Sequence, residues 1–231
     1  MKYSDIYRLY STSQPKDAIH QALREVSVDD SDEQYEDRSP LHLACQYGDT
    51  EGVKILLERD AEPNTKDANG STPIHILGRT SAGCADEDKL KEIAVVLMEH
   101  GANIPRSAKN TTALIECVRN RHFKMAEAII NSGTRVNSTD LNGENVLFGF
   151  CAASGDIRRD IRFAKKELDE SVQYSYPENK IEEIRSRIAR LEDDGEAAYR
   201  LARRLVEEDK VDPEDKSNSG KTAWDAAIET K

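Results

Sequence analysis

Residues 67–80 decide the fold and read Asp-Ala-Asn-Gly-Ser-Thr-Pro-Ile-His-Ile-Leu-Gly-Arg-Thr. Gly70 can adopt the positive φ that the tip of a tight hairpin requires. Thr72 is suited to cap a helix, and Pro73 to open it, because the first position of a helix needs no N–H. Apolar side chains follow at once. The stretch therefore predicts a unit made of a hairpin tip, a helix cap and a short apolar helix.

Copies of this unit recur along the chain. Ser39-Pro40-Leu41-His42-Leu43-Ala44 precedes Thr72-Pro73-Ile74-His75-Ile76-Leu77 by 33 residues, and shorter copies begin at Thr112, Asn145 and Thr222. A second apolar helix is expected behind the first in four places, near residues 53–57, 93–98, 125–130 and 201–206.

This period and this motif resemble the ankyrin repeat, a β-turn followed by two antiparallel helices with a T-P-L-H-x-A core. The resemblance is strong over residues 37–64 and 67–102, weaker over 107–137 and broken over 139–212. It implies an all-α ankyrin-repeat solenoid of helix-turn-helix units with β-hairpin tips, whose usual work is to bind other proteins. It also implies that the histidines at positions 42 and 75 hydrogen-bond the hairpin backbone between repeats.

The predicted organisation is a single ankyrin-repeat domain over residues 1–231, because a repeat array forms one elongated domain. Residues 1–36 are interpreted as a degenerate N-terminal cap with a polar outer face. The predicted repeats and C-terminal half-repeat cover 37–66, 67–105, 106–138, 139–214 and 215–231.

The fourth repeat is expected to contain a helical insertion at residues 156–195. Apolar residues at helical spacing run from Ile157 to Val172 and again from Ile181 to Leu191, with a proline between the two runs. We expect an antiparallel helical hairpin, bounded by helix ends near Gly155 and Gly195. The two apolar strips either bury each other or form a protruding handle for dimerisation or for a partner.

Net charge is −11 over 231 residues, which argues against wholesale binding to nucleic acid or to an anionic membrane. No run of 18 apolar residues occurs, and residues 1–5 lack the apolar core of a signal peptide. A cytoplasmic location is therefore predicted, with secretion into a host cell left open. The four cysteines form no C-x-x-C pair and are expected to be free thiols, with Cys84 exposed in a loop.

No catalytic or cofactor motif occurs in the sequence, so we expect a protein that is not an enzyme and that binds no cofactor or metal. His20, His100 and His122 are scattered and are expected to face solvent. The oligomeric state is not indicated, and a monomer is favoured.

The resemblance places a partner on the hairpin tips and on the concave ends of the first helices. The predicted binding residues are Arg38, Tyr47, Lys66, Asn69, Arg79, Arg106, Lys109, Arg119 and Asn142. Five of the cations are expected to lack a facing acid, and so to present a positive strip to an acidic segment: Lys66, Arg79, Arg106, Lys109 and Arg119. The predicted function is thus a non-enzymatic scaffold that binds a protein partner. The alternative is a regulatory or microbial effector module that docks on an enzyme through the helical insertion.

Overall fold

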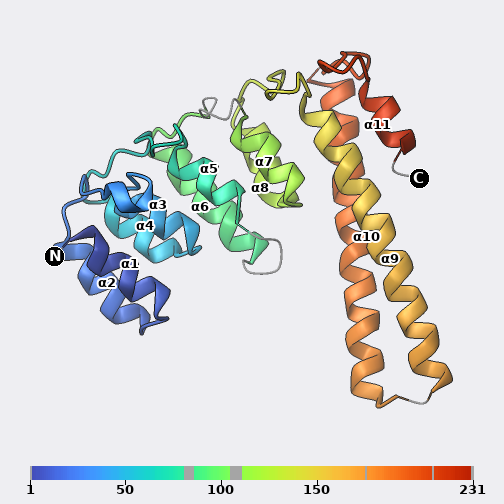
Figure 1. Ribbon diagram of the computed structural model, residues 1–231, viewed down its shortest axis with the longest axis horizontal. Helices are drawn as coiled ribbons and strands as arrows, with labels where there is room; N and C mark the ends of the chain where they lie inside the picture. Colours follow the sequence, from blue (N-terminus) through green and yellow to red (C-terminus); the bar gives the residue numbers. More distant parts are fainter. Residues whose placement is uncertain (1, 81–85, 105–110, 175, 210, 230–231) are drawn as a thin grey trace. The chain divides into compact units, whose positions relative to one another are not determined.

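The computed structural model describes residues 2–80, 86–104, 111–174, 176–209 and 211–229. In those ranges the chain is mostly helical and contains no strand (Figure 1). This agrees with the predicted all-α class, whereas β-hairpin tips are not confirmed, because the tips are hydrogen-bonded turns without strands. The chain divides into two compact units, residues 1–141 and 142–231, which are described separately.

The first unit is built from short helices in two stacked rows. Its elements are α1 (Tyr3–Ser11), α2 (Lys16–Glu25), the 3-10 helix η1 (Glu33–Tyr35), α3 (Pro40–Gln46), α4 (Thr50–Leu57), α5 (Pro73–Gly78), α6 (Glu87–Glu99), α7 (Ala113–Arg119) and α8 (Phe123–Asn131). The odd-numbered helices pack in the order α1, α3, α5 and α7, and the even-numbered helices in the order α2, α4, α6 and α8. Each helix pair is therefore covered by its neighbours, as the stacking of repeats requires.

The core lies between the two rows and consists of aliphatic side chains. Leu41, Leu56, Leu77 and Leu97 are fully buried, each from a different helix of the first unit. Because α3 to α5 contain only six to eight residues each, none could stand alone in water, and packing of the apolar faces holds them.

His42 links the α3–α4 pair to the turn before α5. Its Nδ1 accepts hydrogen bonds from the Ser39 N–H and hydroxyl, at 3.1 and 2.9 Å, and its Nε2 lies 3.0 Å from the Ser71 carbonyl oxygen. Since a carbonyl oxygen can only accept, Nε2 carries the proton and the imidazole is neutral. The predicted bond between repeats is confirmed at His42. Burial lowers the pKa of this histidine.

His122 is buried and His20 is half-buried, so the expectation that these two histidines face solvent is wrong. His20 lies 3.0 Å from the Asp49 carboxylate, which also accepts a 2.8 Å hydrogen bond from the Tyr10 hydroxyl. His122 packs between the Thr80 carbonyl, at 2.7 Å from Nε2, and Glu87 on α6. Both residues are held by groups far away in the sequence, whereas His100 is exposed as expected.

The second unit contains α9 (Val146–Gln173), α10 (Glu178–Glu207) and α11 (Ala223–Glu229). The long helices α9 and α10 lie side by side and are joined at their far ends (Figure 1). Along their shared length, Ala164, Ile184 and Ile188 form a small apolar cluster, and a 2.9 Å ion pair joins Lys165 to Glu192.

Two expected interruptions are absent from this pair: α9 continues through Gly155, and α10 continues through Gly195. A glycine inside a helix costs only about 1 kcal/mol, which packing can outweigh. The expected contribution of Val172 to the apolar seam is also wrong, because its side chain is 55% exposed while the neighbouring Ser171 is buried.

The turn before α11 reproduces the turn before α5. Asp67 N–H donates to the Ser71 carbonyl and Gly70 N–H to the Asp67 carbonyl, at 2.9 and 2.8 Å. Ser217 N–H donates to Lys221 and Gly220 N–H to Ser217, at 2.8 and 2.9 Å. The second unit therefore contains the turn-and-helix motif found in the first, although the repeat boundaries remain a prediction.

The continuous helix α10 gives a test at Gly195. We expect Gly195→Ala to raise the free energy of unfolding by about 0.5–1 kcal/mol, because alanine restricts the unfolded chain and favours helix. The added Cβ would lie 3.6 Å from the Ile157 side chain, an ordinary contact. Gly143→Ala is the matched control: with φ of +73° and a Cβ 2.7 Å from Asn218, it should destabilise. Urea unfolding measures both, and a destabilising Gly195→Ala would contradict the continuous helix.

The lowered pKa of His42 predicts loss of stability in acid. Below the ordinary histidine pKa of about 6.5, this imidazole is protonated in the unfolded chain but stays neutral in the folded chain. The free energy of unfolding therefore falls as the pH decreases from about 6.5 towards the lower pKa of the folded state. One such group contributes a slope of at most about 1.4 kcal/mol per pH unit. Urea midpoints between pH 7.5 and 5 should therefore fall less steeply for His42→Gln than for the unaltered chain. If the urea midpoints of both proteins fell equally with pH, the His42 imidazole would not be the cause of the pH dependence of stability.

Candidate protein-binding surface

The Asp67–Ser71 turn is held rigid by one buried carboxylate. Oδ1 of Asp67 accepts hydrogen bonds from the N–H groups of Asn69 and Ser71, at 2.9 and 2.8 Å. Gly70 has φ of +65°, which supplies the left-handed conformation expected at the tip. Ala68 N–H donates to the Glu36 carbonyl at 2.7 Å, so this turn is tied to the one before α3. Asn69 is consequently presented, half-buried, on a fixed backbone.

Arg38 is held by its own unit and does not extend freely into solvent. Its guanidinium donates to Gln46 on α3 at 2.8 Å and pairs with Glu36 at 2.5 Å. Its Nε lies 3.6 Å from the second oxygen of Asp67, whose side chain is fully buried. Arg38 therefore balances the charge of the carboxylate that organises the turn.

Arg79 and Arg119 also face acids, which corrects the prediction of an unbalanced positive strip. Arg79 Nε lies 3.1 Å from Glu116 on α7, and its Nη1 donates to Ser71 at 3.0 Å. Arg119 lies 2.6 Å from the Asp140 carboxylate. Glu116 is close to Arg79 because α7 packs on α5, whereas Asp140 lies outside the helices, 21 residues after Arg119 in the chain.

Among the other predicted binding residues, Lys66 is exposed. Arg106 and Lys109 fall outside the described residues. Asn142 belongs to the second unit, where its carbonyl accepts a 2.6 Å hydrogen bond from the Asn218 N–H. The predicted residues at positions 38, 47, 66, 69, 79 and 119 thus lie in the first unit, and those at 38, 69 and 79 contact the Asp67–Ser71 turn or belong to it.

An aromatic stack at the N-terminal end was missed in the sequence. Tyr47 follows α3, is 40% exposed, and stacks on Tyr10 of α1 with ring centroids 4.8 Å apart and planes 9° from parallel. The ring centroid of Tyr35 lies 4.3 Å from that of Tyr7 and 5.6 Å from that of Tyr3. Tyrosines held in this way offer large contact area at little cost in side-chain entropy.

The described residues contain neither a metal-binding cluster nor a membrane-spanning helix, and the cysteines among them are free thiols. No group of three or more potential metal ligands occurs among them, and no helix there combines the length and apolar character needed to cross a bilayer. Cys45 and Cys117 are buried free thiols and Cys151 is half-buried, whereas Cys84 lies outside the described residues. Burial raises the pKa of the Cys45 thiol, which disfavours the reactive thiolate.

Comparison with known proteins agrees with the helix pairs and turns. Residues 23–77 match the family model described as ankyrin repeats in many copies. A homolog of transient receptor potential cation channel subfamily A member 1 from Caenorhabditis elegans is 46% identical over 48 residues, which is 21% of this chain and 4% of that protein. Neurogenic locus notch homolog protein 1 of Mus musculus is 31% identical over 134 residues, which is 58% of this chain and 5% of that protein. The chain thus spans only a small part of the curated relatives that it matches.

The central place of Asp67 can be tested by Asp67→Ala. This change strands two backbone N–H groups and removes the acid beside Arg38, so we expect a loss of about 1–3 kcal/mol in the free energy of unfolding. Asp29→Ala is the control, because Asp29 is exposed and a surface change of this kind should stay within about 0.5 kcal/mol. Urea unfolding of both variants measures the difference. Equal stability of the two would remove Asp67 from its organising role.

Proposed function

The chain is an ankyrin-repeat protein over the matched residues, and from that premise we propose that it is a non-enzymatic module that binds a partner protein. Ankyrin repeats are in general modules of protein–protein interaction. We propose further that the partner contacts a binding face of the first unit, made by Arg38, Tyr47, Lys66, Asn69 and Arg79. The observation that carries the proposal is the rigid turn at Asp67, which fixes neighbouring donors and acceptors before any partner arrives.

Preorganisation matters because a partner need not bear the entropy cost of ordering this face. The Asp67 carboxylate fixes the backbone beside Asn69, and the Tyr10 ring supports Tyr47 from beneath. Arg38 and Arg79 are held by acids, so they contribute fixed directions for hydrogen bonds rather than free positive charge. Polar and aromatic contacts therefore support the proposal better than a long positive strip.

An acidic partner segment remains part of the proposal through Lys66. An exposed lysine attracts acids weakly, by about 0–1 kcal/mol for a single pair, and acts mainly on the rate of association. We therefore expect only a moderate loss of binding as salt rises.

The test compares two charge reversals on exposed lysines. Lys66→Glu lies on the binding face and Lys91→Glu lies on α6, away from the turns, with the same change of side chain. After a partner is isolated by affinity capture, its association rate with each variant is measured by surface plasmon resonance. Lys66→Glu should slow association several-fold while Lys91→Glu leaves it close to the original rate. Equal rates for the two would move the contact away from this face.

The second candidate, a regulatory or effector module that docks on an enzyme through α9 and α10, is supported by one observation. Phe163 is 67% exposed on the distal part of α9. Burial of such an aromatic ring against a partner would contribute binding free energy. In the same binding assay, this candidate predicts that Phe163→Ala weakens binding whereas Lys66→Glu has no effect.

A further inference from the structure

Tyrosine rings from α1, from η1 and from the end of α3 meet in the first unit. Tyr35 contacts Tyr7, and Tyr47 stacks on Tyr10. Burial and the nearby Tyr7 hydroxyl raise the pKa of Tyr47, so Tyr7 is close to both groups of rings. We call the three rings that reach the surface, those of Tyr7, Tyr35 and Tyr47, the tyrosine row. The row extends the proposed binding face beyond Tyr47.

The turn that carries Tyr35 is strongly acidic. The N–H groups of Tyr35 and Asp37 both donate to the Asp32 carbonyl, at 2.9 and 3.1 Å, so the turn closes around η1. Between residues 29 and 37 the chain contains no lysine or arginine, and it carries Asp29, Asp30, Asp32, Glu33, Glu36 and Asp37. Glu36 pairs with Arg38 at 2.5 Å, whereas no described lysine or arginine pairs with Glu33 or Asp37. The turn therefore places uncompensated negative charge beside Tyr35.

The carboxylate of Asp37 is not needed to form this turn. The equivalent residue, three positions before the following helix, is Gly70 before α5, Gly143 before α9 and Gly220 before α11, and all three have positive φ. Asp37 adopts the same left-handed conformation, with φ of +52°, although its Cβ makes that conformation less favourable than it is for glycine. Glycine would thus make the turn without the charge.

Rings and carboxylates together favour a cationic ligand. The face of a tyrosine ring attracts an ammonium or guanidinium group that lies within about 6 Å of its centre. The second unit contains one such contact, with Lys180 Nζ 4.8 Å from the centroid of Tyr176. Among the described residues, no lysine or arginine lies over a ring of the tyrosine row in this way. Because Tyr10 covers one face of Tyr47, a cation from a partner would reach the opposite face.

We propose that the tyrosine row binds an arginine-containing segment of the partner, with guanidinium groups stacked on the rings and paired with Glu33 and Asp37. Arginine fits better than lysine, because a guanidinium is flat enough to stack on a ring and donates in a fork to a carboxylate. The inference rests on the proposed function, since Tyr47 belongs to the binding face, and it names the partner's chemistry at that end. The partner segment thus carries arginine over Tyr47 and an acid beside Lys66.

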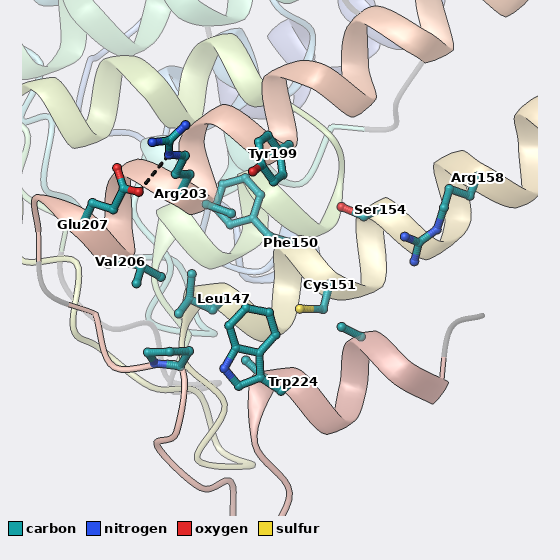
Figure 2. A pocket seen from close by; sticks show the side chains of 14 residues that line it. Leu147, Phe150, Cys151, Ser154, Arg158, Tyr199, Arg203, Val206, Glu207 and Trp224 are labelled. Atoms are coloured by element: carbon teal, nitrogen blue, oxygen red, sulfur yellow. Dashed lines mark hydrogen bonds and ion pairs between the residues drawn. The ribbon is translucent and has the colours of Figure 1, made fainter.

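A groove in the second unit provides a tyrosine with the opposite surroundings. The groove has a volume of about 440 Å³, lies between α9, α10 and α11, and is lined by Tyr199 together with Arg158 and Arg203 (Figure 2). Tyr199 is 69% exposed, so its ring is accessible, but the arginines beside it disfavour a further cation. Tyr199 is therefore a matched control for Tyr47.

The experiment uses the full chain and a short fluorescein-labelled peptide of alternating glycine and arginine, whose binding is followed by fluorescence anisotropy. Physiological salt suppresses attraction that depends only on the net charge of −11. Two further peptides carry lysine or citrulline in place of arginine. We expect saturable binding of the arginine peptide, binding weaker by at least about threefold for the lysine peptide, and none for citrulline, which is flat but uncharged. No binding of the arginine peptide, or equal binding of the arginine and lysine peptides, would overturn the proposal.

Matched variants locate the binding on the tyrosine row. Tyr47→Leu should weaken binding of the arginine peptide by about three- to fivefold, whereas Tyr47→Phe, which keeps the ring, and Tyr199→Leu should stay within about twofold. Glu33→Gln should weaken it by about two- to fourfold, and Glu99→Gln, the same change on an exposed position of α6, should leave it unchanged. Equal weakening by each variant and its control would assign the binding to net charge and overturn the proposal.

Asp37→Gly separates binding from stability. It should weaken binding of the arginine peptide by about two- to threefold while the urea midpoint stays equal or rises, because glycine accepts the left-handed conformation. Unchanged binding by this variant and by Glu33→Gln would remove the acids from the site. Lys66→Glu should not weaken binding of this peptide. Failure of the peptide therefore rejects arginine recognition alone, whereas the partner's association rates with Lys66→Glu and Lys91→Glu decide the proposed binding face.

Discussion

The hydrogen bond from His42 to the Ser71 carbonyl expresses the constraint on which the first unit depends. Short helix pairs cannot bury their own apolar faces, so each pair must sit in fixed register against the next. The imidazole sets that register because one nitrogen is occupied by Ser39 and the other points to the following turn. A neutral ring is the only form that satisfies all of these partners.

The same constraint explains the electrostatics of the proposed binding face. Stacking of α7 on α5 brings Glu116 beside Arg79, and Arg38 of the same face pairs with Glu36. The net charge of −11 therefore does not describe this face, where acids match the two arginines locally and Lys66 is exposed. We therefore expect recognition at this proposed face to depend more on the direction of hydrogen bonds and on Tyr47 than on long-range attraction.

Local features could be predicted from the sequence because the residues that make them are close together. Gly70, Thr72 and Pro73 act within a few residues of one another, and the predicted turn and helix start follow from that proximity. The bond from His42 to Ser71 spans 29 residues and was instead what the resemblance to ankyrin repeats implied. The partners of the arginines could not be predicted, since Glu116 lies 37 residues after Arg79 in the chain.

Elsewhere, packing between distant segments determined the structure against, or without, any preference in the local sequence. Gly195 is a weak helix former, yet α10 continues through it beside Ile157. The Tyr10–Tyr47 stack gives no local signal, because its rings come from α1 and from the end of α3. In each case the deciding contact joins distant segments.

The uninterrupted course of α9 and α10 has a mechanical consequence. A helix of 28 residues is about 42 Å long at a rise of 1.5 Å per residue, and α9 and α10 each run without a break. Because the two unbroken helices pack against each other, we expect the pair to resist bending and to move as one body. A displacement of the helix ends near residue 174 would therefore be transmitted along α9 to the end that carries Leu147.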